Sequence, residues 1–193
     1  MILGITGGTG SGKTTLLNII QELGGMVLDC DAIYHQLLQT DSSLLSSIGK
    51  RFPGTVENGS LQRKKLGTLV FSDTTALEDL NKITHAAVSA AVEKLLEEWP
   101  ALAAIDAIAL FESGLAQLCD ITVAVTAPED LRVQRLIARD GVDEQYARSR
   151  IRAQRPQEEF IKLCDYHLVN DGDQAEFRKK CLAFLTQTGI IEA

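Results

Sequence analysis

The sequence contains few aromatic residues and few cysteines. Aromatic residues make up 5% and hydrophobic residues 45% of its 193 residues, which predicts one domain with a mainly aliphatic core. The cysteines are Cys30, Cys119, Cys164 and Cys181. Because these four are far apart and form no C-x-x-C pair, they predict reduced thiols rather than a disulfide framework or a metal site.

An excess of basic charge and long apolar runs are also lacking. With 19 basic and 26 acidic residues, the formal net charge of −7 disfavours nucleic-acid binding. The most apolar stretch, residues 101–111, is too short to span a bilayer and contains Asp106. Met1 leads directly into a strand-like segment without a signal-peptide pattern. We therefore expect a cytoplasmic protein, a monomer or small homo-oligomer, with neither nucleic acid nor membrane as a partner.

The sequence does contain a phosphate-binding motif directly after its first apolar segment. Residues 2–6 predict a buried parallel strand, and the pattern G-x-x-x-x-G-K-[ST] follows from Gly7 to Thr14. Glycines let successive N–H groups turn towards an anion, and the start of the next helix adds a positive field. In this motif Lys13 reaches the outer phosphates and the Thr14 hydroxyl binds Mg²⁺. The predicted nucleotide contacts are Gly8, Gly10, Ser11, Gly12, Lys13, Thr14 and Thr15.

Carboxylates follow two further predicted strands. The segments 26–29 and 103–109 predict parallel strands, whose carboxyl ends share the ligand-binding edge of an open α/β sheet. Asp29 and Asp31 come at the end of the first, and Asp31 is either a site carboxylate or the cap of a helix over 32–39. Asp106 lies in the second and either holds Mg²⁺ through water or is a buried structural aspartate. Strands over 121–126 and 167–169 complete a five-stranded sheet.

Helical patterns fill the long connection between the second and third strands. They cover residues 42–52, 61–71, 73–84 and 86–99, with a turn-rich PGTVENGS between the first two. This connection is longer than the crossover between two parallel strands needs to be. The stretch is either a substrate-binding insertion or only packing.

Seven of the ten arginines lie between Arg132 and Arg155, where no lysine occurs. Arginine forms forked contacts with phosphate oxygens, and the position after a phosphate loop favours a closing lid. The alternative is a solvated helix face, because nearby acidic residues nearly balance the charge.

Several segments together resemble the dephospho-coenzyme A kinases over nearly the whole chain. The segments are GITGGTGSGKTT (4–15), LDCDAIYHQLL (28–38), GSLQRKKLGTLVF (59–71), LEDLNKITHAAV (77–88), LFESGL (110–115), RLIARDGVDEQYARSRIRAQ (135–154) and VNDG (169–172). The resemblance implies that Asp31 lies near the substrate hydroxyl, that Arg139 and Arg150 belong to a lid, and that Asn170 lies near adenine. The chain departs from the family pattern at Ala86, where proline is usual, and at Ile108-Ala109, where Pro-Leu is usual.

These observations predict an α/β protein with a three-layer P-loop NTPase fold around a five-stranded parallel sheet. The single domain would have its core at about 1–31, 100–130 and 165–193, a helical acceptor-binding insertion at about 32–99, and an arginine-bearing lid at about 131–164. The expected reaction is transfer of phosphate from ATP, with Mg²⁺, to the ribose 3′-hydroxyl of dephospho-coenzyme A, the last step of coenzyme A synthesis.

The expected catalytic residues are Lys13, Asp31, Arg139 and Arg150, with Thr14 and Asp106 at the metal. A nucleoside or nucleotide kinase and a non-catalytic nucleotide-binding regulator are the alternatives. A GTPase switch is disfavoured, because the sequence has no D-x-x-G and its nearest N-K-x-D string, residues 81–84, lacks the aspartate.

Overall fold

Five parallel strands form the centre of the protein. The computed structural model describes residues 1–98 and 101–192. The strands are β1 (Ile2–Thr6), β2 (Met26–Asp29), β5 (Ala103–Asp106), β6 (Ile121–Thr126) and β7 (Tyr166–Val169), and their order is β2-β5-β1-β6-β7. Every neighbouring pair is parallel, and Asp29 lies opposite Asp106 in the register of β2 and β5. The predicted sheet is confirmed, although β5 ends at Asp106 rather than at residue 109.

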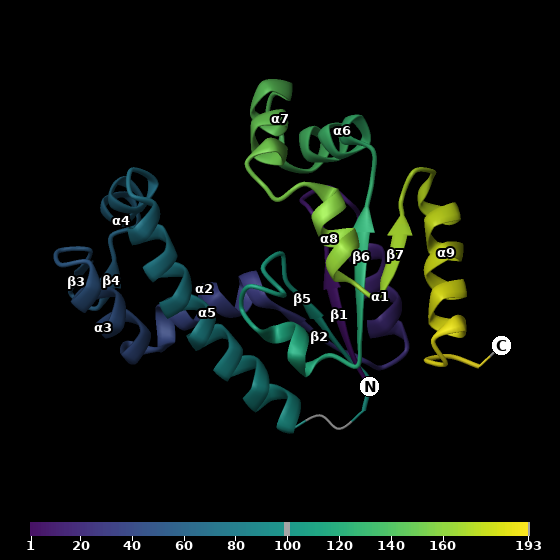
Figure 1. The fold of residues 1–193 in the computed structure, drawn as a ribbon, viewed down its shortest axis with the longest axis horizontal. Coiled ribbons are helices and arrows are strands. Elements are labelled where there is room, and N and C mark those ends of the chain that lie inside the picture. Colours follow the sequence, from purple (N-terminus) through teal and green to yellow (C-terminus); the bar gives the residue numbers. More distant parts are fainter. Residues whose placement is uncertain (99–100, 193) are drawn as a thin grey trace.

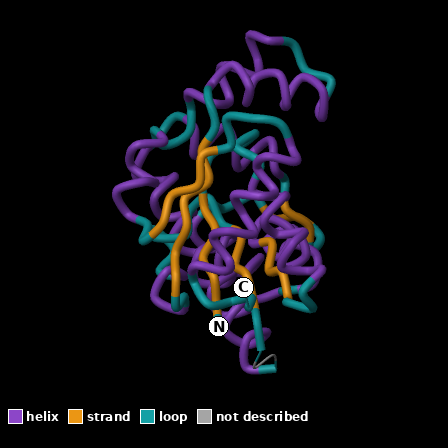
Figure 2. Tube along the Cα trace, turned by 90° about the vertical axis from the view of Figure 1, so that its right-hand side faces the viewer, coloured by secondary structure: helices purple, strands orange, loops and turns teal. Residues whose placement is uncertain are grey.

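Helices cover both faces of the sheet (Figure 1). On one face, α1 (Lys13–Glu22) and α9 (Gln174–Gln187) bury apolar side chains against β1 and β6. On the other face, α5 (Thr74–Glu97), the start of α2 (Cys30–Thr40) and the 3-10 helix η1 (Leu115–Leu118) pack against β2 and β5. Figure 2 shows the strands side by side with helices around them. The predicted three-layer arrangement is therefore confirmed.

The connection from β2 to β5 has an apolar core of its own. It contains α2, α3 (Ser42–Arg51), a short hairpin of β3 (Val56–Glu57) and β4 (Ser60–Leu61), α4 (Arg63–Phe71) and α5. Its buried residues include Leu44, Ile48, Phe52, Leu66 and Val70. One prediction needed correction here: the helices expected at 73–84 and 86–99 are one helix, which ends at Glu97, and residue 99 lies outside the described residues. The turn-rich segment contains the hairpin.

The hairpin and the continuous helix have simple local causes. Asn58 and Gly59 both have positive φ, 49° and 72°, which matches the Asn-Gly turn that favours tight hairpins. Ala86 lies in the middle of α5, where alanine keeps the helix unbroken and a proline would break or kink it.

A small helical unit stands above the carboxyl ends of the strands (Figure 1). It consists of α6 (Glu129–Asp140) and α7 (Glu144–Arg152), joined at Gly141, which ends α6 with a φ of 66°. Val133, Leu136, Ala147 and Ile151 form its apolar centre. The chain returns to the sheet through α8 (Gln157–Leu163), which contacts β6. None of the helices described combines the length and the apolarity of a membrane span.

Candidate active site

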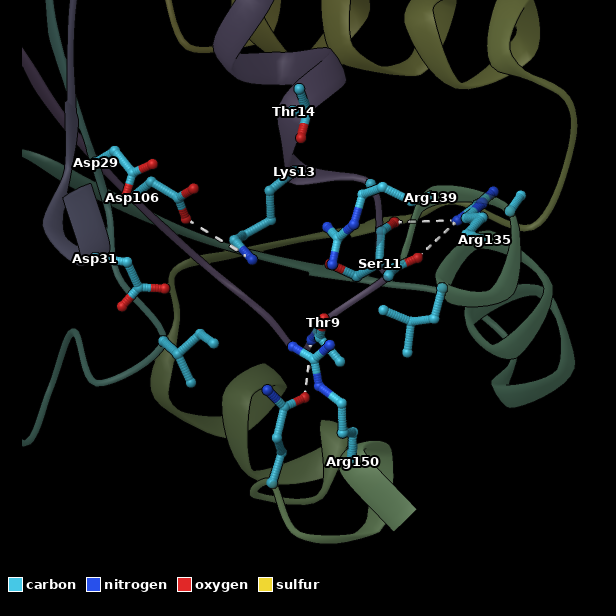
Figure 3. A pocket seen from close by; sticks show the side chains of 16 residues that line it. Thr9, Ser11, Lys13, Thr14, Asp29, Asp31, Asp106, Arg135, Arg139 and Arg150 are labelled. Carbon is cyan, nitrogen blue, oxygen red and sulfur yellow. Dashed lines mark hydrogen bonds and ion pairs between the residues drawn. The ribbon is translucent and has the colours of Figure 1, made fainter. Parts of the chain in front are cut away.

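A cavity of about 680 Å³ opens between the phosphate loop, residues 7–14, and the α6–α7 unit. Its charged lining residues are Lys13, Asp29, Asp31, Asp106, Arg135, Arg139 and Arg150. In Figure 3 the three carboxylates lie to one side of Lys13, and Arg139 and Arg150 lie across the cavity from them. Of the predicted nucleotide contacts, Gly10, Ser11, Gly12, Lys13 and Thr14 line this cavity, whereas Gly8, Thr15 and Asn170 are not among the described lining residues.

The phosphate loop leads into α1 through Gly12. This residue is the N-cap, with a left-handed φ of 97°, and no described side chain caps the helix start. A side chain at Gly12 would also collide with the amide of Asn170. The N–H groups at the start of α1 are therefore free of a capping side chain beside the cavity, and the helix dipole favours an anion there.

Lys13 is held between the loop and a carboxylate. Its ammonium donates a hydrogen bond to the carbonyl of Gly7 at 3.0 Å and lies 3.8 Å from Asp106 Oδ1. Burial raises the pKa of Asp106 and outweighs the opposing charge of Lys13, while Asp29 and Asp31 raise this pKa further. The exposed hydroxyl of Thr14 lines the same cavity. A cation and several acidic oxygens thus meet where the sequence predicts phosphates and a metal ion.

Asp29 and Asp31 have different structural roles. Asp29 is the N-cap of α2 and accepts a hydrogen bond from the N–H of Ala32 at 3.0 Å. Asp31 lies within the first turn of α2, is exposed and lines the cavity. The interpretation of Asp31 as the cap is therefore wrong, because the helix begins two residues earlier than the sequence pattern indicated.

A second cavity of about 180 Å³ adjoins the first. Asp31 and Ile108 line both cavities. The second is mostly apolar, and its other lining residues include Cys30, Tyr34, Thr84, His85, Val88, Ser113 and Leu115. His85 lies inside α5 and is among the residues that line this cavity. Asp31 thus stands where the two cavities meet.

Polar side chains also hold the backbone of the phosphate loop itself. Arg135 donates to the carbonyls of Gly10 and Ser11 at 3.2 and 3.3 Å and to the side-chain oxygen of Asn170 at 3.0 Å. Asn170 is 4% exposed, and its amide donates to the carbonyl of Ser11 at 2.9 Å. Burial lowers the pKa of Arg135. Sequence reasoning grouped Arg135 with the other arginines and missed this role, because only the fold brings Arg135 next to the loop.

Arg139 and Arg150 are held by one carboxylate at the cavity. Asp140 accepts hydrogen bonds from Arg139 at 2.7 and 3.1 Å and from Arg150 at 2.9 Å. The Arg139 side chain nevertheless remains 61% exposed. Hydrogen bonds from both guanidinium groups lower the pKa of Asp140. Asp140 thus keeps the two arginines beside the cavity, where they can exchange its carboxylate for another anion.

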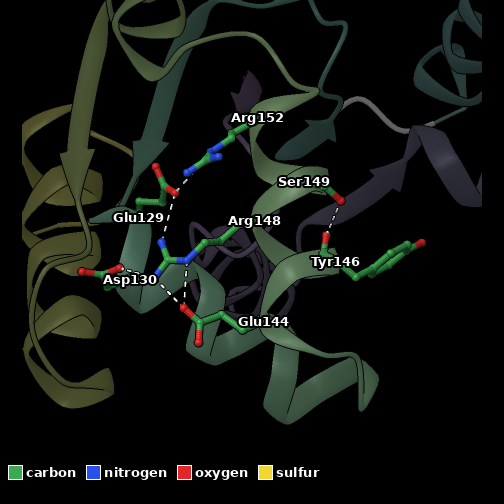
Figure 4. A network of polar contacts seen from close by, with 7 residues as sticks. All are labelled: Glu129, Asp130, Glu144, Tyr146, Arg148, Ser149 and Arg152. Carbon is green, nitrogen blue, oxygen red and sulfur yellow. Dashed lines mark hydrogen bonds and ion pairs between the residues drawn. The ribbon is translucent and has the colours of Figure 1, made fainter.

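The outer arginines form ion pairs on the surface of α7 (Figure 4). Arg148 lies 3.2 Å from Glu129, 3.0 Å from Asp130 and 2.8 Å from Glu144. Arg152 approaches Glu129 at 4.0 Å, and Arg155, beyond the end of α7, pairs with Glu112 at 2.5 Å. For these three arginines the solvated-face interpretation describes the structure better than a phosphate contact does.

Comparison of the sequence with known proteins identifies its family. The sequence profile of the dephospho-CoA kinase family matches residues 1–176. A dephospho-CoA kinase of Syntrophotalea carbinolica is 36% identical, over 97% of this chain and 92% of that protein. One from Geobacillus kaustophilus is 35% identical, over 100% of this chain and 98% of that protein. A crystal structure from Thermus thermophilus superposes with a TM-score of 0.80 at 33% identity, covering 97% of each chain. The chain therefore belongs to the dephospho-CoA kinase family.

Proposed function

We propose that this protein transfers the terminal phosphoryl group of ATP to the ribose 3′-hydroxyl of dephospho-coenzyme A, giving coenzyme A and ADP. Family membership supports this substrate pair. The structural observation that carries the proposal is the place of Asp31, which lines both the charged cavity and the smaller apolar one. A carboxylate at such a junction can face an acceptor hydroxyl on one side and a phosphoryl donor on the other.

The charged cavity suits a nucleoside triphosphate. The first-turn N–H groups of α1 and the ammonium of Lys13 provide positive charge on the loop side, and Arg139 and Arg150 provide it across the cavity. Phosphoryl transfer depends mainly on positioning and on neutralising charge at the moving group. Lys13 can leave Asp106 for a phosphate oxygen, and the two arginines can leave Asp140 in the same way. The arginines also cover the site, which limits the access of water.

Asp31 is the proposed general base. Its carboxylate would orient the ribose hydroxyl towards the phosphoryl group and accept the hydroxyl proton as the new P–O bond forms. Asp29 is unsuited to this role, since its carboxylate is occupied in capping α2. Asn170 remains a predicted adenine neighbour, and its bonds to Ser11 and Arg135 give it a second task behind the loop.

The residues around Lys13 fit a magnesium ion. Mg²⁺ prefers oxygen ligands and usually keeps water and phosphate oxygens in its shell. The Thr14 hydroxyl and the Asp106 carboxylate supply such oxygens at the cavity. No three acidic, histidine or cysteine side chains in the described residues form a closed metal cage, which agrees with a metal shared with the nucleotide. When bound, the ion neutralises charge on the phosphates.

We further propose that the helical connection, about 32–99, binds the acceptor and that about 131–164 acts as the lid. Tyr34, Thr84 and His85 belong to the first segment and line the apolar cavity. Arg139 and Arg150 belong to the second. On this view Ile108, which replaces a proline usual in similar sequences, shapes the passage between donor and acceptor.

An acceptor screen tests the proposed function. ADP release from ATP and Mg²⁺ is followed with dephospho-coenzyme A, nucleosides or nucleoside monophosphates, with Lys13→Ala as an inactive control that retains its fold by circular dichroism. We expect strong preference for dephospho-coenzyme A. Faster turnover with a nucleoside or nucleotide would reassign the protein to that kinase class. Slow hydrolysis that no acceptor stimulates would identify a nucleotide-binding regulator instead.

A further inference from the structure

Thr9, at the tip of the phosphate loop, is held by two side chains from outside the loop. Its carbonyl accepts a hydrogen bond from Arg132 Nε at 2.8 Å, and its N–H donates to Gln154 Oε1 at 2.8 Å. Arg132 Nη2 also donates to Gln154 Oε1 at 3.2 Å. Three hydrogen bonds thus close a ring through Thr9, Arg132 and Gln154, which we call the tip clamp. Both backbone polar groups of Thr9 are occupied by it.

Arg132 is buried in an unusual way for a cation. It is 3% exposed, and no carboxylate of the described residues forms an ion pair with it. Glu129 influences it only at longer range and is itself paired with Arg148. Burying a guanidinium without a paired anion costs folding free energy, so the presence of Arg132 beneath the loop calls for an explanation. A side chain at Gly8 would collide with this guanidinium, which shows how closely the loop lies on it.

Gln154 connects the clamp to the lid. It lies two residues beyond the end of α7, and Arg150 lies one helical turn before it. Gln154 also lines the charged cavity, whereas Arg132 is not among the described lining residues. Any shift of the C-terminal end of α7 relative to the loop would stretch the bond from Thr9 to Gln154. The clamp therefore fixes both the shape of the loop tip and the distance between the loop and Arg150.

We propose that Arg132 and Gln154 are positioning residues, which hold the glycine-rich loop in its nucleotide-binding shape and set the lid in register with it. The proposal rests on the function proposed above only in taking the ligand to be a nucleoside triphosphate. A loop with glycines at positions 7, 8, 10 and 12 has little stiffness of its own. Ordering it only when ATP arrives would weaken binding by the entropy lost, and the clamp orders it beforehand. The charge of Arg132 adds a positive field behind the loop without touching the ligand.

The test compares two glutamines that are three residues apart. Gln154→Leu removes the clamp, and the matched control Gln157→Leu removes a similar side chain, whose oxygen accepts only from the N–H of Ala127 at 3.0 Å, away from the loop. Binding of a fluorescent ATP analogue is titrated without acceptor, and kcat and KM are measured for both substrates. Gln154→Leu should weaken nucleotide binding roughly tenfold, as expected for the loss of one or two hydrogen bonds. Its KM for dephospho-coenzyme A should stay unchanged, and Gln157→Leu should bind nucleotide normally.

Two further variants separate geometry from charge and from folding. Gln154→Glu keeps the acceptor oxygen, so trypsin cleavage near the loop should stay as slow as in the wild type, while it should be faster in Gln154→Leu. Arg132→Lys keeps a positive charge but replaces the two donor nitrogens that bond Thr9 and Gln154 by a single ammonium without the forked geometry, and it should weaken nucleotide binding about as much as Gln154→Leu. Equal nucleotide affinity in Gln154→Leu, Arg132→Lys and the wild type would overturn the proposal. If Gln154→Leu unfolds, the nucleotide affinity of Arg132→Lys alone decides whether the proposal stands. The binding titration stays informative even if dephospho-coenzyme A is not the acceptor, so failure of the clamp and failure of the function are distinguishable.

Discussion

The two sides of the phosphate loop use the same kinds of cationic side chain in different ways. On the cavity side, Lys13 lies near Asp106, and Arg139 and Arg150 share Asp140. Arg132 and Arg135, which we call the far side although Arg135 also lines the cavity, donate to backbone carbonyls of the loop itself. A carboxylate can be exchanged for a phosphate, because both are anions whose oxygens accept charge-assisted hydrogen bonds from a guanidinium or an ammonium. A loop carbonyl cannot be given up without changing the shape of the loop.

This difference separates two functions that one stretch of sequence encodes. On the function proposed above, the cations that contact a carboxylate at the cavity take part in the reaction. The cations whose partners are only loop carbonyls and side-chain amides maintain the site. Substitutions on the cavity side should therefore reduce turnover while leaving the fold intact. Substitutions on the far side should reduce nucleotide affinity and stability together.

The largest expected effect on the cavity side belongs to Asp31→Asn. Loss of a general base lowers turnover by roughly 10²–10⁴-fold. The melting temperature should stay near that of the wild type, since Asp29 and not Asp31 caps α2. Asp29→Asn is the matched control, because asparagine still caps a helix and should retain most activity. Steady-state kinetics and thermal unfolding of both variants check this, and near-normal turnover of Asp31→Asn would remove Asp31 from the chemistry.

Arg139→Lys and Arg150→Lys should have the next largest effect. Lysine keeps the charge and loses the forked geometry, so we expect kcat to fall about 10- to 100-fold with little change in ATP affinity. Nucleotide titrations alongside kinetics separate these two quantities. If both variants remain fully active, the arginines at the cavity belong with Arg148 and Arg152 on the solvated face.

Asn170→Ala tests the far side. The change leaves the carbonyl of Ser11 without one donor and Arg135 without one acceptor, and a lost buried hydrogen bond costs about 1–3 kcal/mol of unfolding free energy. We expect this loss in urea unfolding, together with weaker nucleotide binding. A variant with normal stability and lower affinity for adenine nucleotides only would instead favour a direct contact with the base.

Asp106→Asn should reduce turnover and yet stabilise the fold at neutral pH. The folded-state pKa of Asp106 is raised, so the folded protein disfavours the charged carboxylate above this pKa. The destabilisation is absent below the unfolded pKa and develops as the pH rises through the folded one. The stability gain in Asp106→Asn should therefore be absent in acid and grow as the pH rises towards 7. Unfolding curves at several pH values measure it, and a variant less stable than the wild type at pH 7 would contradict it.

Arg148→Gln is expected to have the smallest effect. Its three carboxylate partners are on the protein surface, where water and salt screen ion pairs. The melting temperature should change by no more than about 2 °C and turnover should be unaffected. A large loss of turnover would move Arg148 into the group of arginines that act on phosphate.

The local sequence predicted those features whose causes are local. The strand–glycine–helix order of residues 2–14 and the apolar strand at 121–126 were recognisable, because their hydrogen bonds and burial follow from short patterns. The Asn-Gly hairpin at residues 58–59 also had a local signal, which sequence reasoning overlooked.

The sequence could not separate side chains of one type by their surroundings. Arg132 and Arg139 share a helix, but one is buried under Thr9 and the other is exposed. Which of them meets a carbonyl and which meets Asp140 depends on how α6 lies over the loop. Similarly, the cap of α2 was not identified from the sequence, because the pattern predicted a helix from residue 32 and the helix begins at Cys30.

The central place of β1 in the sheet has a consequence for the order of folding. Ile2 pairs with Ala103 of β5, and Leu3 pairs with Ile121 of β6, so β1 gains both neighbours only after Ile121 has been synthesised. Such distant pairings slow folding, because long segments must be closed into loops first. The phosphate loop needs Asn170 as well. Because the loop precedes all of these partners in the sequence, it acquires its shape late, and we expect chains that are still being synthesised to be unable to bind nucleotide.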